Sequence, residues 1–123
     1  MTAQQIWLCR VILVIVVLVI AYLATTPLTM ALTVSVSDKL LHGLAFLVLL
    51  LLADYSWPAT GLGADKLVWV FAYGVLIEVV QYFLPYRDFS PADMLANALG
   101  MGVYPLIVPL LRRLPLLGVR WSL

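Results

Sequence analysis

Four long apolar segments dominate this chain and restrict what it can fold into. They cover residues 6–24, 40–57, 67–84 and 92–111. A helix needs about 20 mainly apolar residues to cross the hydrocarbon layer of a membrane. Each segment is near that length, and prolines, glycines and polar residues separate one from the next. The sequence therefore predicts an all-α integral membrane bundle of four transmembrane helices, forming a single domain over residues 1–123.

The composition also favours a membrane environment. Hydrophobic residues make up 65% of the 123 residues, charged residues make up 11%, and the mean hydropathy is +1.12. Soluble domains are about 45–50% apolar and about 25% charged, and a domain this small cannot hide the excess in its core. A net charge of +1 does not indicate a nucleic-acid partner. We therefore expect the lipid bilayer as the main partner, and the oligomeric state stays open.

The lysine and arginine residues predict the orientation in the membrane. Four spans place both termini on one side, together with the loop after the second helix. Five of the seven basic residues then lie on that side, namely Arg10, Lys66, Arg112, Arg113 and Arg120. Lys39 and Arg87 lie on the other side. Because basic residues are enriched in cytoplasmic loops, we predict that the N and C termini are cytoplasmic.

Polar residues from three segments are predicted to lie near the extracytoplasmic ends of the helices. In chain order they are Asp38, Lys39, His42, Glu78, Gln81, Arg87, Asp93 and Asn97. Helical spacing puts Asp38 on one face with His42, and Asp93 on one face with Asn97. The inner halves of the helices are expected to carry almost nothing polar apart from Arg10. Gly43, and Gly100 with Gly102, are expected to let helices approach closely. The sequence thus predicts one outward-facing polar pocket.

A purely structural role accounts for Glu78 less well than for any of the other polar residues. An acidic group near the C-terminal end of a helix opposes the helix dipole. An acidic residue at the middle of a span costs roughly 2.5–3.5 kcal/mol on insertion scales. Ionisable residues inside a membrane are functional-site candidates by default. The structural alternative is a buried ion pair or hydrogen bond with Arg87, His42 or Asn97 that locks the bundle.

The other polar residues each have a chemical and a structural interpretation. His42 is the only histidine; it suits proton transfer and forms a candidate acid–base pair with Glu78. Arg87 suits the binding of a phosphate or carboxylate, or it anchors a helix end at the interface. Asp38 and Asp93 also suit the first turns of helices. A mixed metal site of His42 with Asp38, Glu78 and Asp93 is conceivable, but the spacing matches no metal motif, so the sequence predicts neither a metal nor another cofactor.

Most of these polar residues belong to three short sequence motifs. They are Asp38-Lys39-Leu-Leu-His42, then Glu78-x-x-Gln81 followed by Arg87, then Asp93-x-x-x-Asn97-x-x-Gly100. In this order they resemble the VanZ-like family of bacterial membrane proteins, over roughly residues 35–103. The family is named for an accessory protein linked to resistance to the glycopeptide antibiotic teicoplanin. The resemblance implies a multi-pass protein of the bacterial cytoplasmic (inner) membrane with a role in the cell envelope.

The leading functional hypothesis is binding of the head group of an envelope lipid or a lipid-linked cell-wall intermediate. The predicted ligand-binding residues are Asp38, Lys39, Gln81, Arg87, Asp93 and Asn97. One alternative is a membrane-embedded enzyme that uses Glu78 and His42 as acid and base on a lipid-linked substrate. Another is a proton-coupled transporter, and a third is an assembly role in which the polar residues only fix helix packing. Whether the protein is an enzyme stays open on the sequence.

Overall fold

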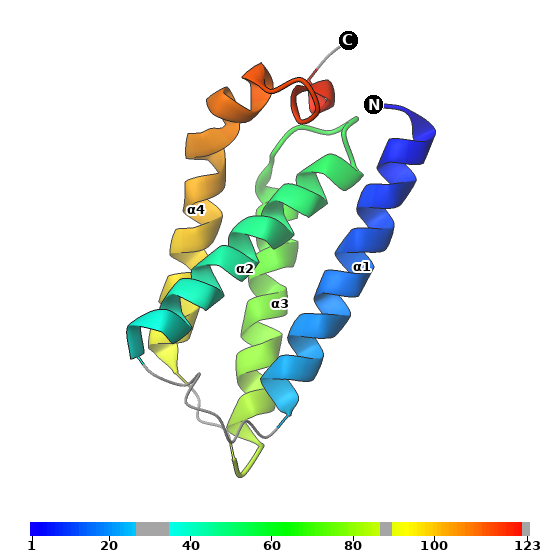
Figure 1. Ribbon diagram of the computed structural model, residues 1–123. Coiled ribbons are helices and arrows are strands. Elements are labelled where there is room, and N and C mark those ends of the chain that lie inside the picture. Colours follow the sequence, from blue (N-terminus) through cyan, green and yellow to red (C-terminus); the bar gives the residue numbers. More distant parts are fainter. Residues whose placement is uncertain (27–34, 87–89, 122–123) are drawn as a thin grey trace.

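The structure is a bundle of helices (Figure 1). It is a computed structural model that describes residues 1–26, 35–86 and 90–121, with side chains in the second helix described from Lys39 onward. The helices are α1 (Ala3–Thr25), α2 (Ser35–Ser56), α3 (Ala64–Tyr82), α4 (Pro91–Arg113) and the short 3-10 helix η2 (Gly118–Arg120). The described ranges contain no strand. The all-α prediction with four long helices is confirmed.

Polar capping residues explain why α1 and α4 begin before the predicted residues. The Thr2 hydroxyl accepts the Gln5 backbone N–H at 3.2 Å, and the Gln5 side-chain oxygen accepts the Thr2 N–H at 2.8 Å. This reciprocal pair is a capping box. At α4, the Ser90 hydroxyl accepts the Asp93 N–H at 3.4 Å, and proline occupies the first turn. Because the first turns of these helices contain polar residues and proline, the apolar pattern alone places the helix starts too late.

Among the described residues, three helices are long and apolar enough to cross a membrane. They are α1, the Lys39–Ser56 part of α2, and α4. Helix α3 is not one of them; it has 19 residues, and its charged residues Asp65, Lys66 and Glu78 lie near both of its ends. The prediction of membrane-spanning helices is therefore confirmed for three of the four, and the crossing of α3 stays a prediction.

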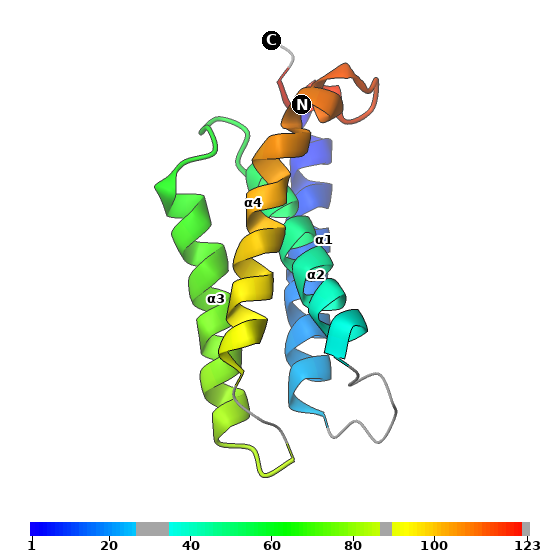
Figure 2. The same ribbon diagram turned by 90° about the vertical axis from the view of Figure 1, so that its left-hand side faces the viewer.

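Helix α2 lies at the centre of the arrangement. It packs most extensively against α4, then against α1, and less against α3. Helices α2 and α4 run in the same direction, and the two chain termini lie at the same end of the bundle (Figures 1 and 2). The short loops between the second, third and fourth apolar segments predict that α2–α3 and α3–α4 are antiparallel neighbours, and both pairs are in contact. The dominant α2–α4 pair, however, was not among the predicted neighbours.

Two glycines explain the close approach of α2 and α4. A Cβ atom added to Gly100 would lie 2.0 Å from the carbonyl oxygen of Gly43. A Cβ atom on Gly43 would lie 3.5 Å from the carbonyl oxygen of Ala96. Small residues let helix backbones meet in this way, so the prediction for Gly43 and Gly100 is confirmed. The prediction for Gly102 is wrong, because a Cβ atom there would meet nothing within 4 Å.

The apolar core lies between α2, α3 and α4. Its buried members are Phe46, Leu49, Leu50, Ala53, Val70, Met101, Tyr104 and Leu111. No residue of α1 is fully buried, and large apolar side chains such as Leu18 (63% exposed) cover its outer face. In water, an apolar surface of this extent marks an interaction site or an aggregation liability. Lipid is therefore the natural solvent for this face.

Candidate functional site

One end of the bundle gathers polar side chains from three helices. Lys39 and His42 come from α2, Glu78 comes from α3, and Asp93 and Asn97 come from α4; we call these five residues the polar cluster. Nδ1 of His42 lies 3.1 Å from Oδ1 of Asn97. Lys39 forms an ion pair with Asp93, and Nε2 of His42 lies 3.7 Å from Oδ2 of Asp93. The structure thus brings together five of the eight predicted site residues.

Glu78 lies at the bottom of the polar cluster and is fully buried. Its Oε2 atom accepts the backbone N–H of Ser90 at 3.1 Å. Its Oε1 atom is buried and has no hydrogen-bond partner among the described residues. Glu78, His42 and Asp93 can each offer one nitrogen or oxygen atom such that all three atoms lie within 4.8 Å of one another. Because a buried polar atom without a partner is costly, the described contacts do not account for Oε1 of Glu78. The predicted alternative of an ion pair with Arg87 lies outside the described residues.

Exposure decreases from the rim of the polar cluster to its floor. The side chain of Lys39 is 37% exposed, that of His42 is 23% exposed and that of Asp93 is 11% exposed. Asn97 and Glu78 are buried below them. A ligand would therefore approach over Lys39 and His42 and reach Glu78 last.

The remaining predicted residues are placed differently. The amide nitrogen of Gln81 donates to the carbonyl oxygen of Ala24 at 3.0 Å, which ties α3 to the end of α1. Oε1 of Gln81 is buried without a hydrogen-bond partner in the described part of the chain. The side chain of Asp38 and all of Arg87 lie outside the described residues. Gln81 thus belongs to the same end of the bundle, and its amide nitrogen is directed at α1.

Gly74 supports the polar cluster and was not singled out from the sequence. A Cβ atom at this position would lie 2.8 Å from the ring of Phe46 and 3.1 Å from Nδ2 of Asn97. Glycine at this point of α3 therefore makes room for the amide of Asn97 beside the core. The only signal in the sequence is a glycine within an apolar helix one turn before Glu78.

A second buried polar group lies toward the opposite end, which corrects the expectation that the inner halves carry almost nothing polar. Oδ1 of Asp54 lies 2.9 Å from Nζ of Lys66 and 3.1 Å from a terminal nitrogen of Arg120. Oδ2 of Asp54 accepts the hydroxyl of Tyr104 at 2.6 Å. All four side chains are buried, and we call them the Asp54 network. Lys66 and Arg120 therefore have a structural role in addition to adding positive charge at this end of the bundle.

The Asp54 network closes the C-terminal end of α2. Carbonyl groups in the last turn of a helix lack intrahelical donors, and basic side chains satisfy them favourably. Lys66 and Arg120 donate to backbone carbonyls at distances of 2.8–3.5 Å. The accepting carbonyls belong to Asp54, Trp57, Pro58 and Thr60. The helix-dipole argument that singled out Glu78 applies equally to Asp54 and would have singled out that residue, though not its partners.

Comparison with known protein families identifies the family of this chain. Residues 7–112 match the family described as VanZ/LLP1, and this range includes every member of the polar cluster. Comparisons with curated proteins and with solved structures gave no match. The family match covers most of the 123 residues and confirms the resemblance drawn from the three motifs. The chain belongs to the VanZ/LLP1 family.

Proposed function

We propose that the chain crosses the bacterial inner membrane four times, with cytoplasmic termini and an extracytoplasmic polar cluster. The excess of basic residues at the end that carries the termini supports this orientation. Charged residues within membranes usually face the interior of the bundle and find partners there. Two charged residues of α3 follow that rule, because Glu78 lies in the polar cluster and Lys66 lies in the Asp54 network. The charges of α3 are thus compatible with a fourth span.

We propose further that the polar cluster binds the head group of an envelope lipid or a lipid-linked cell-wall intermediate. The observation that carries this proposal is Oε1 of Glu78, which is buried without a partner among the described residues, at the floor of a cluster that opens over Lys39 and His42. Lys39 would bind an anionic phosphate or carboxylate at the rim, and we propose that Arg87, which lies outside the described residues, also contributes. Asn97 would help to orient the head group. The link of the family's namesake with teicoplanin resistance points to the same compartment.

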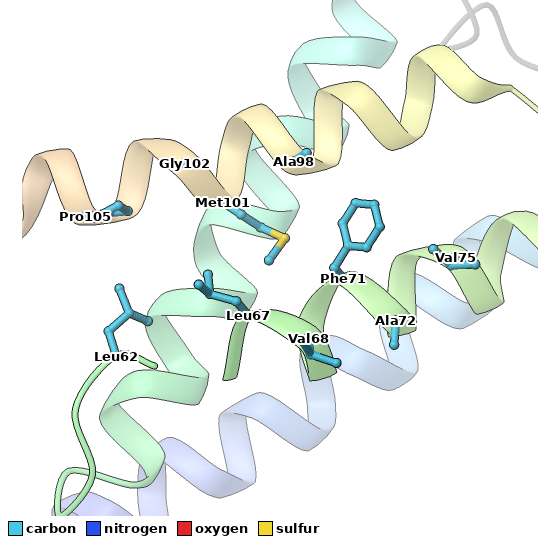
Figure 3. Close-up of a pocket in the computed structure, with 10 residues that line it drawn as sticks. All are labelled: Leu62, Leu67, Val68, Phe71, Ala72, Val75, Ala98, Met101, Gly102 and Pro105. Atoms are coloured by element: carbon cyan, nitrogen blue, oxygen red, sulfur yellow. The ribbon is translucent and has the colours of Figure 1, made fainter. Parts of the chain in front are cut away.

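An apolar groove supports a ligand with a hydrocarbon chain. The groove lies between α3 and α4 and has a volume of about 870 Å³ (Figure 3). It is lined by Leu62, Leu67, Val68, Phe71, Ala72, Val75, Ala98, Met101, Gly102 and Pro105. Val75 precedes Glu78 by one helical turn and Ala98 follows Asn97 directly, so one end of the groove adjoins the polar cluster. We propose that the chain of the bound lipid occupies this groove while its head group occupies the cluster.

Lys39→Ala and Arg87→Ala are each expected to weaken binding of an anionic envelope lipid by about tenfold or more, because each removes a charge-assisted contact. The purified protein in neutral-lipid nanodiscs would be titrated with phosphatidylglycerol and with undecaprenyl phosphate. Arg113→Ala is the matched control, since Arg113 is exposed near the other end of the bundle. Equal affinity of the wild type and Arg87→Ala would contradict the proposal.

A second arm of the same titration tests the groove. A Cβ atom on Gly102 meets nothing within 4 Å, so Gly102→Leu fills the groove without touching the backbone of another helix. We expect weaker binding of the long-chain lipid and unchanged binding of a short-chain analogue with the same head group. Equal binding of the long-chain lipid to Gly102→Leu and wild type would contradict the proposal for the groove. Bulk lipid or a second protein molecule, and not the hydrocarbon chain of the ligand, would then cover it.

An acid–base enzyme is the second candidate, because ligand atoms of Glu78 and His42 lie within 4.8 Å of each other. Such a pair suits proton transfer to and from an attacking water. Incubation with labelled lipid-linked substrates tests this, and unchanged substrates would remove its support. Transport is less well supported, because the core residues Phe46, Leu49 and Leu50 lie along α2 between the polar cluster and Asp54.

A further inference from the structure

We propose that the polar cluster binds a divalent transition-metal ion of the zinc or manganese type between His42, Glu78 and Asp93. One ligand atom from each residue lies within 4.8 Å of the other two. Zinc bonds to nitrogen and oxygen are about 2.0–2.2 Å long and usually tetrahedral, so two ligand atoms of one ion lie roughly 3.3–3.6 Å apart. Side-chain shifts of about 1 Å would bring the three ligand atoms to that spacing. This inference stands whether or not an envelope lipid is the ligand.

The second polar atom of two of these side chains is already held by the protein. Nδ1 of His42 lies 3.1 Å from Oδ1 of Asn97, and with the amide in this orientation the ring nitrogen is the donor, because an amide oxygen only accepts. The other ring nitrogen, Nε2, is the one directed at Asp93. One carboxylate oxygen of Asp93 is paired with Lys39. Metal-binding histidines and carboxylates are commonly oriented by such outer contacts.

Glu78 supplies the independent observation that points to a cation. Its Oε2 atom is held by the Ser90 N–H, whereas its fully buried Oε1 atom has no partner within the described residues. A buried carboxylate oxygen is costly unless it meets a donor or a cation. Glu78 belongs to the same group of ligand atoms as His42 and Asp93. A cation within that group would therefore give Oε1 of Glu78 the partner that the described residues do not supply.

The set of ligand types indicates which cation fits. One imidazole with two carboxylates suits zinc or manganese, whereas calcium takes six to eight oxygen ligands and magnesium keeps several waters. The two acids carry two negative charges and Lys39 carries one positive charge, so a bound divalent ion would change the net charge of the cluster from −1 to +1. The sequence did not predict this site because its ligands come from three different helices and form no local motif. A proton shared between His42 and Asp93 is the competing occupant, and the experiments separate the two.

The first experiment measures metal binding to the full-length protein in detergent. After treatment with a chelator, the protein would be dialysed against Zn²⁺ and, separately, against Mn²⁺, and bound metal would be measured by mass spectrometry. We expect one ion per chain for the wild type and binding about 10- to 100-fold weaker for Asn97→Leu, which loses only the orienting contact. His42→Ala and Glu78→Gln should lose the ion. Asp65→Asn, which changes an exposed acid near the opposite end of the bundle, should bind like wild type.

The second experiment separates a metal ion from a proton and does not depend on any variant. Because His42 is the only histidine, ¹⁵N-labelled histidine gives the signals of one imidazole. We expect Zn²⁺ at constant pH to shift the signal of one ring nitrogen while the other keeps its proton. An imidazole spectrum that responds to pH but not to Zn²⁺ or Mn²⁺ would overturn the proposal. Equal metal content in the wild type and folded Glu78→Gln would overturn it as well.

Discussion

Gly100→Ala is expected to force α2 and α4 apart and to destabilise the protein by about 3 kcal/mol or more. The added Cβ atom would lie 2.0 Å from the carbonyl oxygen and 2.6 Å from the carbonyl carbon of Gly43. Overpacking usually costs about 1–3 kcal/mol, and occasionally more; here the clash is with backbone, which cannot rotate away. Thermal unfolding in detergent, followed by circular dichroism and light scattering, measures the loss.

Gly102→Ala is the matched control for this prediction. It lies on the same helix, and its new Cβ atom would meet nothing within 4 Å. Replacing glycine by alanine within a helix stabilises by roughly 0.5–1 kcal/mol, so we expect this variant to unfold at or slightly above the wild-type temperature. Equal unfolding temperatures for Gly100→Ala and Gly102→Ala would contradict the tight α2–α4 contact.

Asp54→Ala is expected to be the most damaging change at the opposite end of the bundle. It leaves the charges of Lys66 and Arg120 buried without their acid, and the hydroxyl of Tyr104 without its acceptor. Removing one partner of a buried ion pair costs about 3–5 kcal/mol. Chemical denaturation of the purified protein would measure the loss.

Two further variants make the Asp54 result specific. Asp54→Asn keeps an acceptor for Tyr104 but removes the charge, so its stability should lie between those of Asp54→Ala and wild type. Asp65→Ala removes an exposed acid from the start of α3 and should change stability by less than about 0.5 kcal/mol. Similar losses for Asp54→Ala and Asp65→Ala would show that the network does not hold the end of α2.

The helices were largely predictable from the sequence, but their pairing was not. Apolar segments of membrane-spanning length are read directly from the chain, and α1, α2 and α4 match that reading. Short loops suggested α2–α3 and α3–α4 as neighbours, whereas the closest pair is decided by Gly43 meeting Gly100. Such a contact depends on the rotation of each helix about its axis. A pattern of apolar residues leaves that rotation open when lipid surrounds the bundle.

The two polar regions differ in how far they could be predicted. The polar cluster follows from polar residues at matching depths on three helices, although its pairings, such as Lys39 with Asp93, needed the structure. The Asp54 network was missed because its partners are distant in the chain. Asp54 is 12 positions from Lys66 and 66 positions from Arg120. Arg120 lies beyond the last membrane helix, where a basic residue is typically an interface anchor. Its burial depends on the C-terminal turn folding back, and the sequence pattern does not predict that turn.

The most direct test of the account measures the separation of His42 and Glu78 in a membrane. Each is the only residue of its type in the chain, so ¹⁵N-histidine and side-chain ¹³C-glutamate label a single pair of sites. Dipolar recoupling by solid-state NMR in liposomes would then report that distance alone. We predict measurable dephasing at long recoupling times, because a ring nitrogen and a carboxylate oxygen of these residues lie within 4.8 Å. No dephasing in folded, labelled protein would place Glu78 away from His42 and contradict the existence of the polar cluster.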